Sequence, residues 1–278
     1  MIVGTMVYEA LIARAGIARR DAEILLAAAW KLSRGALLAR AGELVPDDVV
    51  ERFMRLSARR AEGEPVAYLL GRREFWSLEF EVGPAVLVPR PETELLVERV
   101  LAQLTAAAAS VADLGTGSGA IAIALAHERP GWRVLGSDLS ADALNVARRN
   151  GASLVADRVE WRSGDWYQAL GSQRFDALAS NPPYVAAVDP VLTGDGLRHE
   201  PRAALTPGGD GLGALTTLIN GAPGHLLPGG WLFLEHGATQ GAVVRDALVA
   251  RGFTHVTSHR DLAGRERITE GQIPNARF

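Results

Sequence analysis

Residues 111–119 read Val-Ala-Asp-Leu-Gly-Thr-Gly-Ser-Gly, an apolar run that passes directly into a glycine-rich turn. The apolar residues predict a short buried strand, and the alanine-rich stretch at about 119–128 predicts a helix directly after it. Glycine at such a junction lets the backbone turn sharply and approach a ligand closely. The spacing differs from the G-x-G-x-x-G of dinucleotide-binding proteins, and no Gly-Lys-Ser/Thr follows as in a P-loop. The candidate ligand contacts in this loop are Gly115, Thr116, Gly117, Ser118 and Gly119.

From about residue 110 onward, apolar runs alternate with helical patterns. The apolar runs predict strands at about 111–114, 132–135, 159–161, 175–179, 231–235, 253–258 and 265–270. Helical patterns predict helices at about 119–128, 141–150 and 239–250. This alternation is typical of a mostly parallel sheet with helices on both faces. We therefore expect an α/β fold built on a seven-stranded, mostly parallel sheet.

Two further segments precede this sheet. Residues 5–61 carry apolar side chains at helical spacing and predict a small helical module. Residues 72–88 predict a β-hairpin that turns at Gly83-Pro84. Pro91 then predicts the start of a helix that ends at about residue 104. The expected domains are an N-terminal helical domain at 1–70, a hairpin linker at 71–90 and the sheet domain at 91–278.

Composition excludes several classes of function. The 278 residues include no cysteine, which excludes disulfides, thiolate metal sites and a cysteine nucleophile. The histidines are scattered, so no metal site is expected. A net charge of −3 and a pI of about 6.1 argue against a protein that grips nucleic acid by its phosphates. With no long apolar run and no signal-peptide pattern, we expect a cytoplasmic protein, and a monomer is the working expectation for its oligomeric state.

Asp138 stands at the end of the second predicted strand, 19 positions after Gly119. In open α/β sheets, a carboxylate at this place accepts hydrogen bonds from ribose hydroxyls. Alternatively, the same carboxylate serves only the positive end of the helix that follows it. Together with the glycine loop, Asp138 fits a cofactor that carries a nucleoside, but it does not decide the chemistry.

Residues 181–184 read Asn-Pro-Pro-Tyr and come directly after the fourth predicted strand. Pro182 and Pro183 hold the loop stiff and have no N–H group, so carbonyl acceptors dominate it. Asn181 adds an amide oxygen, and Tyr184 adds an aromatic face. Two acceptors and a ring suit a planar –NH₂ group. Because ligands of such sheets bind beyond the carboxyl ends of the strands, this loop should meet the glycine loop in one cleft.

Further motifs accompany these signals along the chain. They are Glu74-Phe75-Trp76, residues 87–94 (Leu-Val-Pro-Arg-Pro-Glu-Thr-Glu), Glu200-Pro201-Arg202, Leu234-Glu235-His236-Gly237 and residues 261–267 (Asp-Leu-Ala-Gly-Arg-Glu-Arg). With these motifs, the chain resembles the HemK/PrmC family of peptide chain release factor glutamine methyltransferases. The resemblance covers nearly the whole chain, including the N-terminal helices, and residues 110–260 resemble class I methyltransferases that use S-adenosylmethionine.

The resemblance implies a class I, Rossmann-like methyltransferase fold. It implies methyl transfer from S-adenosyl-L-methionine to the side-chain nitrogen of the glutamine in the Gly-Gly-Gln motif of release factors, with the N-terminal helices docking that partner. The implied cofactor contacts are Gly115, Thr116, Gly117, Ser118, Gly119, Asp138, Trp166 and Asn181. The implied glutamine contacts are Asn181, Pro182, Pro183 and Tyr184, of which Asn181, Pro182 and Tyr184 are the expected catalytic residues. The Trp166 indole either packs on the adenine or belongs to the core.

The chemistry of the residues agrees with this implication. A sulfonium methyl group is already electrophilic, so neither a metal nor a covalent nucleophile is required. The Asn181 oxygen and the Pro182 carbonyl can orient the two amide hydrogens so that the nitrogen points at the methyl group. A strong general base is not required before transfer, because the proton can leave afterwards.

Three other interpretations of the function remain open at this point. A nucleic-acid amino methyltransferase would present an adenine amino group to the same Asn-Pro-Pro-Tyr loop, although the acidic pI argues against it. A nicotinamide-dependent oxidoreductase would use the glycine loop, although its spacing and residues 181–184 argue against that. A non-catalytic binding module would have no use for Asn181.

Overall fold

A computed structural model describes residues 6–275 of the chain. The predicted domain ends at residues 1–5 and 276–278 lie outside the described residues. The chain forms two compact units, each with its own core. One unit comprises the described residues up to Arg72 together with Thr193–His199, and the other comprises Arg73–Leu192 and the described residues from Glu200 onward.

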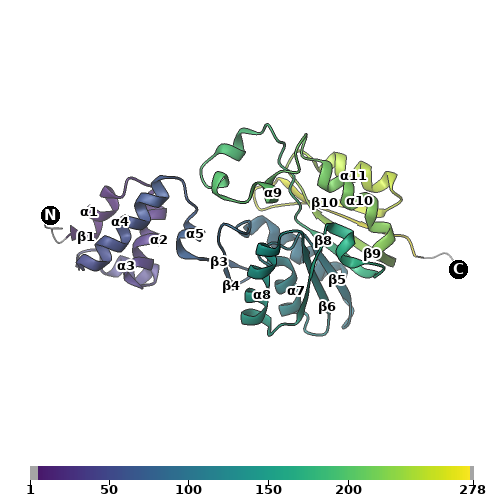
Figure 1. The fold of residues 1–278 in the computed structure, drawn as a ribbon, viewed down its shortest axis with the longest axis horizontal. Coiled ribbons are helices and arrows are strands. Elements are labelled where there is room, and N and C mark those ends of the chain that lie inside the picture. Colours follow the sequence, from purple (N-terminus) through teal and green to yellow (C-terminus); the bar gives the residue numbers. More distant parts are fainter. Residues whose placement is uncertain (1–5, 276–278) are drawn as a thin grey trace. The chain divides into compact units, whose positions relative to one another are not determined.

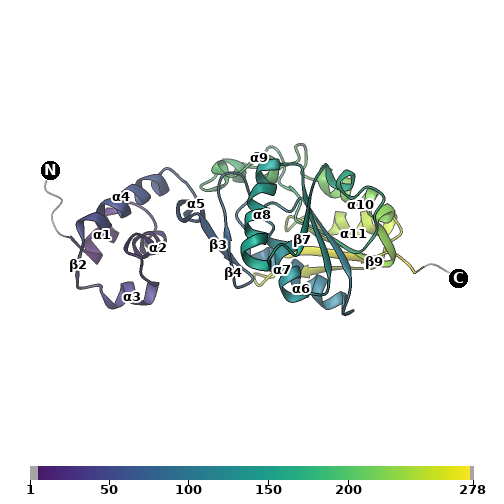
Figure 2. The same cartoon turned by 60° about the horizontal axis from the view of Figure 1, so that its bottom comes forward.

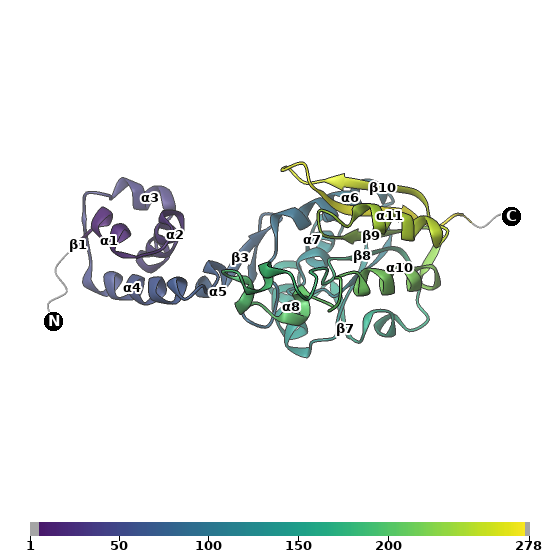
Figure 3. The same ribbon diagram turned by 90° about the horizontal axis from the view of Figure 1, so that it is seen from above.

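The N-terminal unit is a group of short helices around one apolar core. Its elements are β1 (Met6–Val7), α1 (Tyr8–Arg14), α2 (Arg19–Trp30), α3 (Arg34–Ala39), β2 (Leu44–Val45), α4 (Asp47–Ala61) and α5 (Val66–Leu70). In α4, the buried residues Val49, Val50 and Phe53 recur at helical spacing, with carboxylates in the first turn and arginines in the last. Figure 3 shows α4 running alongside the group formed by α1, α2 and α3. The predicted helical module is therefore present.

A buried carboxylate and a returning segment complete this unit. Glu23 on α2 is buried and accepts a hydrogen bond from the Tyr8 hydroxyl at 3.1 Å. Thr193–His199 returns to the end of α4, where the Gly196 N–H donates to the Gly63 carbonyl at 3.1 Å. Local sequence patterns do not indicate where such a segment belongs, because its contacts are made with residues far away in the chain.

The second unit is built on one seven-stranded sheet of order β10-β11-β9-β8-β5-β6-β7. The strands are β5 (Ser110–Leu114), β6 (Arg133–Asp138), β7 (Val159–Ser163), β8 (Phe175–Ser180), β9 (Leu226–Glu235), β10 (Thr254–Arg260) and β11 (Glu266–Gln272). β5 to β9 pair in parallel, whereas β11 is antiparallel to β9 and β10 is antiparallel to β11. The predicted fold class is confirmed, and each predicted strand corresponds to one of these seven.

Helices cover both faces of this sheet (Figure 1). They are α6 (Glu94–Gln103), α7 (Ala120–Glu128), α8 (Ala141–Val155), α10 (Gly213–His225) and α11 (Gly241–Ala250). α6, α7 and α8 pack together on one face, and α10 packs with α11 on the other (Figure 2). Alternate strand residues such as Ala112, Leu114 and Leu178 are fully buried in the core that α10 and α11 cover. Short elements between these are η1 (Pro91–Thr93), η2 (Trp166–Leu170), η3 (Pro190–Thr193), η4 (Leu197–His199) and α9 (Arg202–Leu205).

The sequence patterns did not predict α10. This helix contains Gly213, Gly221, Pro223 and Gly224, which are the residues that usually interrupt a helix. Burial of Leu218 and its neighbours against the sheet outweighs that propensity. Across residues 6–275, no helix combines the length and the apolar character that crossing a bilayer requires.

The hairpin exists, but the predicted position of its turn is wrong. β3 (Arg72–Phe75) pairs with β4 (Leu78–Glu81), and the chain turns at Trp76-Ser77 rather than at Gly83-Pro84. Both turn residues are left-handed, with φ of 53° and 57°, as in a type I′ turn. The Trp76 N–H donates to Glu94 Oε1 at 2.8 Å, so a distant side chain holds a turn that ordinary residue preferences disfavour.

Candidate functional site

A cavity of about 380 Å³ opens at the carboxyl ends of β5, β6 and β8. Its volume lies in the range of pockets that bind small molecules, and its place is the one expected for ligands of an open α/β sheet. The predicted site residues in its lining are Gly115, Thr116, Gly117, Ser118, Asp138, Trp166, Asn181 and Pro183. Of the described residues, the lining omits the predicted Gly119, Pro182 and Tyr184.

The glycine loop is shaped by its own backbone. Gly115 and Gly117 have φ of 73° and 57°, a region that side-chain-bearing residues rarely adopt. The N–H groups of Gly115 and Thr116 both donate to the Ser137 carbonyl, at 2.9 and 2.8 Å. A Cβ on Gly117 would meet no atom of the chain within 4 Å, so this residue faces the cavity. Glycine here therefore supplies both the turn and the space above it.

Asp113 stabilises the buried side of this loop through hydrogen bonds. Its Oδ2 accepts hydrogen bonds from Thr116 Oγ1 at 2.6 Å and from the Ala122 N–H at 3.3 Å. Among the described atoms, its other oxygen has no hydrogen-bond partner. Burial raises the pKa of Asp113 to about 7, against which these two hydrogen bonds work. Sequence reasoning missed this role because Asp113 reads simply as the polar end of a strand.

Asp138 is held in place by backbone N–H groups. Its Oδ2 accepts from Gly117 and its Oδ1 accepts from Ser140, both at 2.9 Å. The cap of α8 is made by Ser140, whose hydroxyl accepts from the Ala143 N–H at 3.2 Å. Ser140 caps the helix, so the Asp138 carboxylate is not needed for that role. It lies at the cavity edge, and its remaining lone pairs can accept hydrogen bonds from a ligand.

Trp166 takes part in both the cavity wall and the core. It begins η2 with φ of 44°, and its ring packs against the apolar core under α10. A Cβ on Gly115 would lie 3.2 Å from this ring, so glycine lets the indole close over the loop. Trp166 therefore packs on the core and also lines the cavity, whereas its predicted contact with the adenine stays a prediction.

Gly119 serves packing rather than the cavity wall. A Cβ on Gly119 would lie 2.8 Å from the Trp161 ring, and one on Gly136 would lie 2.4 Å from it. Gly151 approaches the same ring, at 3.0 Å. Three glycines from three elements thus make room for one tryptophan beneath the glycine loop. The cofactor contact predicted for Gly119 stays a prediction.

The Asn-Pro-Pro-Tyr loop is held by side chains from distant segments. Asn181 Nδ2 donates to Thr93 Oγ1 at 3.1 Å, and Thr93 Oγ1 donates to Glu235 Oε2 at 2.6 Å. The Tyr184 hydroxyl donates to the other Glu235 oxygen at 3.1 Å. Pro182 is buried, whereas Pro183 reaches the cavity. The loop therefore presents Asn181 and Pro183 to the cavity and anchors Tyr184 behind it.

Glu235 is the centre of this anchoring and was missed as a site residue. It closes β9 and is 1% exposed. Burial raises the pKa of Glu235 to about 7, and the nearby Arg267 partly offsets this. The sequence offered two signals for Glu235. It belongs to the motif Leu234-Glu235-His236-Gly237, and it is a carboxylate at the end of an apolar strand, which is an unfavourable place for a charge without partners.

Comparison with known proteins gives the family. The methyltransferase small domain family matches residues 91–212, and the PrmC N-terminal domain family matches residues 8–71. A release factor glutamine methyltransferase of Xylella fastidiosa is 51% identical over 259 residues, which cover 93% of this chain and 94% of that one. The corresponding protein of Pseudomonas aeruginosa is 49% identical over 255 residues, which cover 92% of each chain. The chain belongs to the release factor glutamine methyltransferase family.

Membership of the release factor glutamine methyltransferase family confirms the resemblance found in the motifs. The chain is an S-adenosylmethionine-dependent methyltransferase, as predicted. Among solved structures, a methyltransferase from Pyrococcus furiosus superposes with a TM-score of 0.54 at 19% identity, over 80% of this chain and 99% of that one. That likeness concerns the fold.

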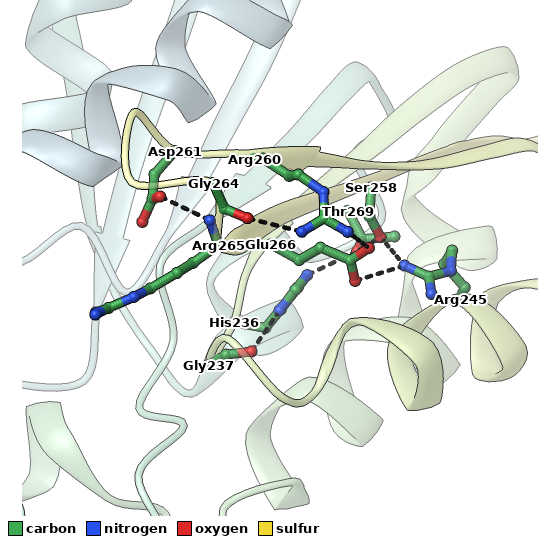
Figure 4. Close-up of polar contacts among 10 residues, drawn as sticks. All are labelled: His236, Gly237, Arg245, Ser258, Arg260, Asp261, Gly264, Arg265, Glu266 and Thr269. Atoms are coloured by element: carbon green, nitrogen blue, oxygen red, sulfur yellow. Dashed lines mark hydrogen bonds and ion pairs between the residues drawn. The ribbon is translucent and has the colours of Figure 1, made fainter.

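In this methyltransferase, His236 follows directly after β9 and takes part in the polar contacts with Gly237 and Thr269 that Figure 4 shows. His236 is fully buried, with Nε2 2.7 Å from Thr269 Oγ1 and Nδ1 2.9 Å from the Gly237 carbonyl. Burial lowers the pKa of His236, which favours the neutral ring. Gln240 extends the support, because its side chain joins the Gly237 N–H to the Tyr184 carbonyl. His236 thus stabilises the segment after β9 through its hydrogen bonds.

The buried carboxylate of Glu200 joins two segments of the cavity lining. Glu200 accepts a hydrogen bond from the Val88 N–H at 3.0 Å and from Arg90 Nη2 at 2.6 Å. Arg90 and Pro201 both line the cavity, so this ion pair joins two lining segments that are far apart in sequence. Within residues 6–275, no cluster of three or more His, Cys, Asp or Glu side chains is arranged to hold a metal ion.

Proposed function

We propose that this enzyme methylates the side-chain amide nitrogen of the glutamine in the Gly-Gly-Gln motif of peptide chain release factors. The single observation that carries the proposal is the Asn181 amide at the cavity edge. Its nitrogen is engaged by Thr93 at 3.1 Å, so its oxygen is left to accept from an incoming –NH₂ group. Identity to release factor glutamine methyltransferases over 93% of the chain supports the same substrate.

The cavity residues fit S-adenosylmethionine. The oriented Asp138 carboxylate suits the ribose hydroxyls, and the open space above Gly117 lets the cofactor approach the loop backbone. The Trp166 ring suits the face of the adenine. When bound, S-adenosylmethionine supplies an electrophilic methyl group on a sulfonium. We accordingly assign the cofactor to the loop at 115–119, with Asp138, Trp166 and Asn181.

The residues of the Asn-Pro-Pro-Tyr loop position the glutamine. The Asn181 oxygen and the Pro182 carbonyl accept the two amide hydrogens, so the nitrogen lone pair is directed at the methyl group. The same two dipoles stabilise the positive charge that develops on nitrogen. Pro183 lines the cavity, and the Tyr184 ring is fixed through its hydroxyl bond to Glu235. The proton leaves the nitrogen after methyl transfer.

The N-terminal helical domain is proposed to dock the release factor. The proposed segments are residues 1–70 for docking, 71–90 as a hairpin linker and 91–278 for methyl transfer. Three large apolar side chains among the described residues of the helical unit are exposed, Val7 at 39%, Leu38 at 48% and Leu44 at 61%. We expect Leu44→Asp to raise KM for the release factor while cofactor affinity stays at the parent value. Val249→Asp on α11, a position also 61% exposed, is the matched control, and an equal KM for both variants would contradict docking through Leu44.

We also propose that the protein acts as a cytoplasmic monomer without direct contact to nucleic acid. The absence of cysteine supports a cytoplasmic location, and the net charge of −3 supports the lack of contact with nucleic acid. Light scattering of the purified protein tests whether it is a monomer. Titration with duplex DNA at low salt tests whether it binds nucleic acid.

The decisive experiment is peptide mass spectrometry of a purified release factor after incubation with this enzyme and S-adenosylmethionine. We expect one added methyl group on the glutamine of the Gly-Gly-Gln peptide. A release factor with that glutamine replaced by alanine is the control and should remain unmodified. Methyl transfer to duplex DNA, with none to the release factor, would overturn the proposal.

A further inference from the structure

Three polar side chains from three distant segments form one line of hydrogen bonds that begins at Asn181 of the Asn-Pro-Pro-Tyr loop. Thr93 stands at the end of η1, Asn181 follows β8, and Glu235 closes β9. Thr93 lies 88 positions from Asn181 and 142 positions from Glu235, and both contacts are hydrogen bonds, at 3.1 and 2.6 Å. Thr93 and Glu235 are buried, at 4% and 1% exposure, so water competes little for the hydrogen bond between them.

The direction of each hydrogen bond follows from the number of hydrogens. A threonine hydroxyl has one hydrogen, and here it goes to the Glu235 carboxylate. Toward Asn181, Thr93 can then only accept, so it binds the –NH₂ half of that amide. The Tyr184 hydroxyl also donates to Glu235, and both oxygens of the carboxylate are therefore used as acceptors. As a result, the Asn181 oxygen is turned away from Thr93 and is free for the cavity.

We propose that Glu235, acting through Thr93, sets the direction of the Asn181 amide and so serves as a positioning residue for methyl transfer. This inference rests on the proposed function, in which the Asn181 oxygen receives the target –NH₂ group. An asparagine amide can sit in either of two directions that differ by a half-turn and fill nearly the same space. Only one of them presents an acceptor to the target nitrogen, and the other presents a second –NH₂ group to it.

Protonation of Glu235 would reverse the order of donors. A proton on Glu235 Oε2 is donated to Thr93, whose own hydrogen then turns toward Asn181. To accept that hydrogen, Asn181 must turn its oxygen to Thr93 and its –NH₂ group to the cavity. The productive direction of the amide therefore requires that Glu235 Oε2 remain a hydrogen-bond acceptor, as it is in the ionised form.

The surroundings of Glu235 set the pH at which this reversal takes place. Burial raises the pKa of Glu235 to about 7, with Glu92 acting in the same direction. Arg267 on β11 and the Tyr184 hydroxyl act in the opposite direction. His236, the next residue along β9, directs its ring nitrogens to Thr269 and Gly237. We therefore expect kcat to decline as the pH falls below about 7.

The first test compares substitutions of Thr93 in the full-length enzyme with a release factor as substrate. Thr93→Val keeps the shape and removes the hydroxyl, and we expect kcat to fall about 10-fold to 100-fold because a charge-linked hydrogen bond is lost. The cofactor Kd should change by less than about 3-fold. Thr93→Ser restores the hydroxyl and should recover most of kcat. Thr217→Val on α10, which removes an exposed hydroxyl bonded to Gly213, is the matched control.

The second test is the pH profile of kcat, which a purely structural role would not alter. Glu235→Gln cannot titrate, so its profile should lack the decline on the acid side that the parent shows. The same decline in Glu235→Gln as in the parent would overturn the inference. So would equal kcat values for Thr93→Val and Thr93→Ser.

These outcomes are separable from failure of the proposed function. If the parent enzyme does not methylate the release factor, the proposed function fails. If the parent is active and Asn181→Ala is not, while Thr93→Val retains the parent kcat, the function stands and only the positioning role of Glu235 is wrong.

Discussion

The loop at residues 115–119 and the loop at residues 181–184 border the same cavity, but they are held in different ways. The first is held by backbone groups and by two nearby carboxylates, with contacts that span 3 to 22 positions of the chain. The second is held by side chains that lie 88 and 142 positions apart. One half of the site is therefore a local structure, and the other half exists only when distant segments have come together.

This difference predicts how each half responds to substitution. Backbone N–H donors, such as those of Gly117 and Ser140 on Asp138, are unaffected by most side-chain changes. The hydrogen bonds that join Asn181, Thr93 and Glu235 are made by side chains, so substitution of any one of these residues breaks the connection. We expect the Asn181 half to be more sensitive in catalytic rate and the glycine-loop half to be more sensitive in cofactor affinity.

The largest effect is expected for Asn181→Ala, which removes an acceptor for the target amide. The rate should fall about 10²–10³-fold, as for the loss of one preorganised hydrogen-bonding group at a reacting atom. Cofactor affinity should change much less. Single-turnover kinetics with the release factor, alongside calorimetry with the cofactor, measure the two quantities.

Asn181→Asp sharpens that test. It keeps an oxygen acceptor, so we expect more activity than in Asn181→Ala but less than in the parent. The structure gives a reason for the deficit, because the new carboxylate would lie one hydroxyl away from the buried Glu235. Full activity in both variants would show that Asn181 only shapes the turn, and the contrast between the two loops would then disappear.

The next largest effect is expected for Asp138→Ala. A carboxylate that binds ribose hydroxyls contributes about 1.5–3 kcal/mol, so the cofactor Kd should rise about 10-fold to 150-fold. The rate at saturating cofactor should change little, because this binding is the same before and during methyl transfer. Calorimetry checks the affinity, with Asp138→Asn as a milder variant that keeps one oxygen. An unchanged Kd in Asp138→Ala would remove Asp138 from the cofactor site.

Gly136→Ala tests whether the local half depends on the packing beneath it. The added Cβ would lie 2.4 Å from the Trp161 ring, and overpacking of this kind costs about 1–3 kcal/mol of the free energy of unfolding. Gly35→Ala on α3, where a Cβ meets nothing within 4 Å, is the control and should leave stability equal or higher. Urea unfolding measures both. Equal stability of Gly136→Ala and the parent would mean that the ring moves aside freely.

The smallest effect concerns the pH dependence of stability. The folded-state pKa of Asp113, about 7, lies above its unfolded value, so the folded protein keeps a proton that the unfolded chain loses. The contribution of Asp113 to the free energy of unfolding should therefore decrease as the pH rises from about 4 to about 7, and the raised pKa of Glu235 adds to the same decrease. Asp113→Asn should flatten this decrease in urea unfolding, and Asp246→Asn at an exposed position of α11 is the control. A parent whose stability rises through this range would contradict the burial of Asp113 as an acid.

Much of the fold could be predicted because its signals are local. The strand at β5 and the helix at α7 follow from an apolar run and an alanine-rich run on either side of glycines. Glycine was required there because Gly115, Gly117 and Gly119 all take positive φ. The elements that were missed are those in which tertiary contacts override propensity. α10 forms with Pro223 inside it, and the hairpin turns at Trp76 because Glu94 holds it.

The sequence by itself determined the seven strands of the sheet, most of the helices between them, the glycine turn, and the residues at the carboxyl ends of β6 and β8. It did so because backbone preferences and strand periodicity act between neighbours in the chain. Only the tertiary structure decided that Gly119 packs against Trp161 and that Tyr184 is turned toward Glu235. It also decided the direction of the Asn181 amide. Those features depend on contacts between residues far apart in the chain: which hydroxyl donates to which oxygen, and whether a methyl group has room. A local pattern of side chains does not specify such contacts.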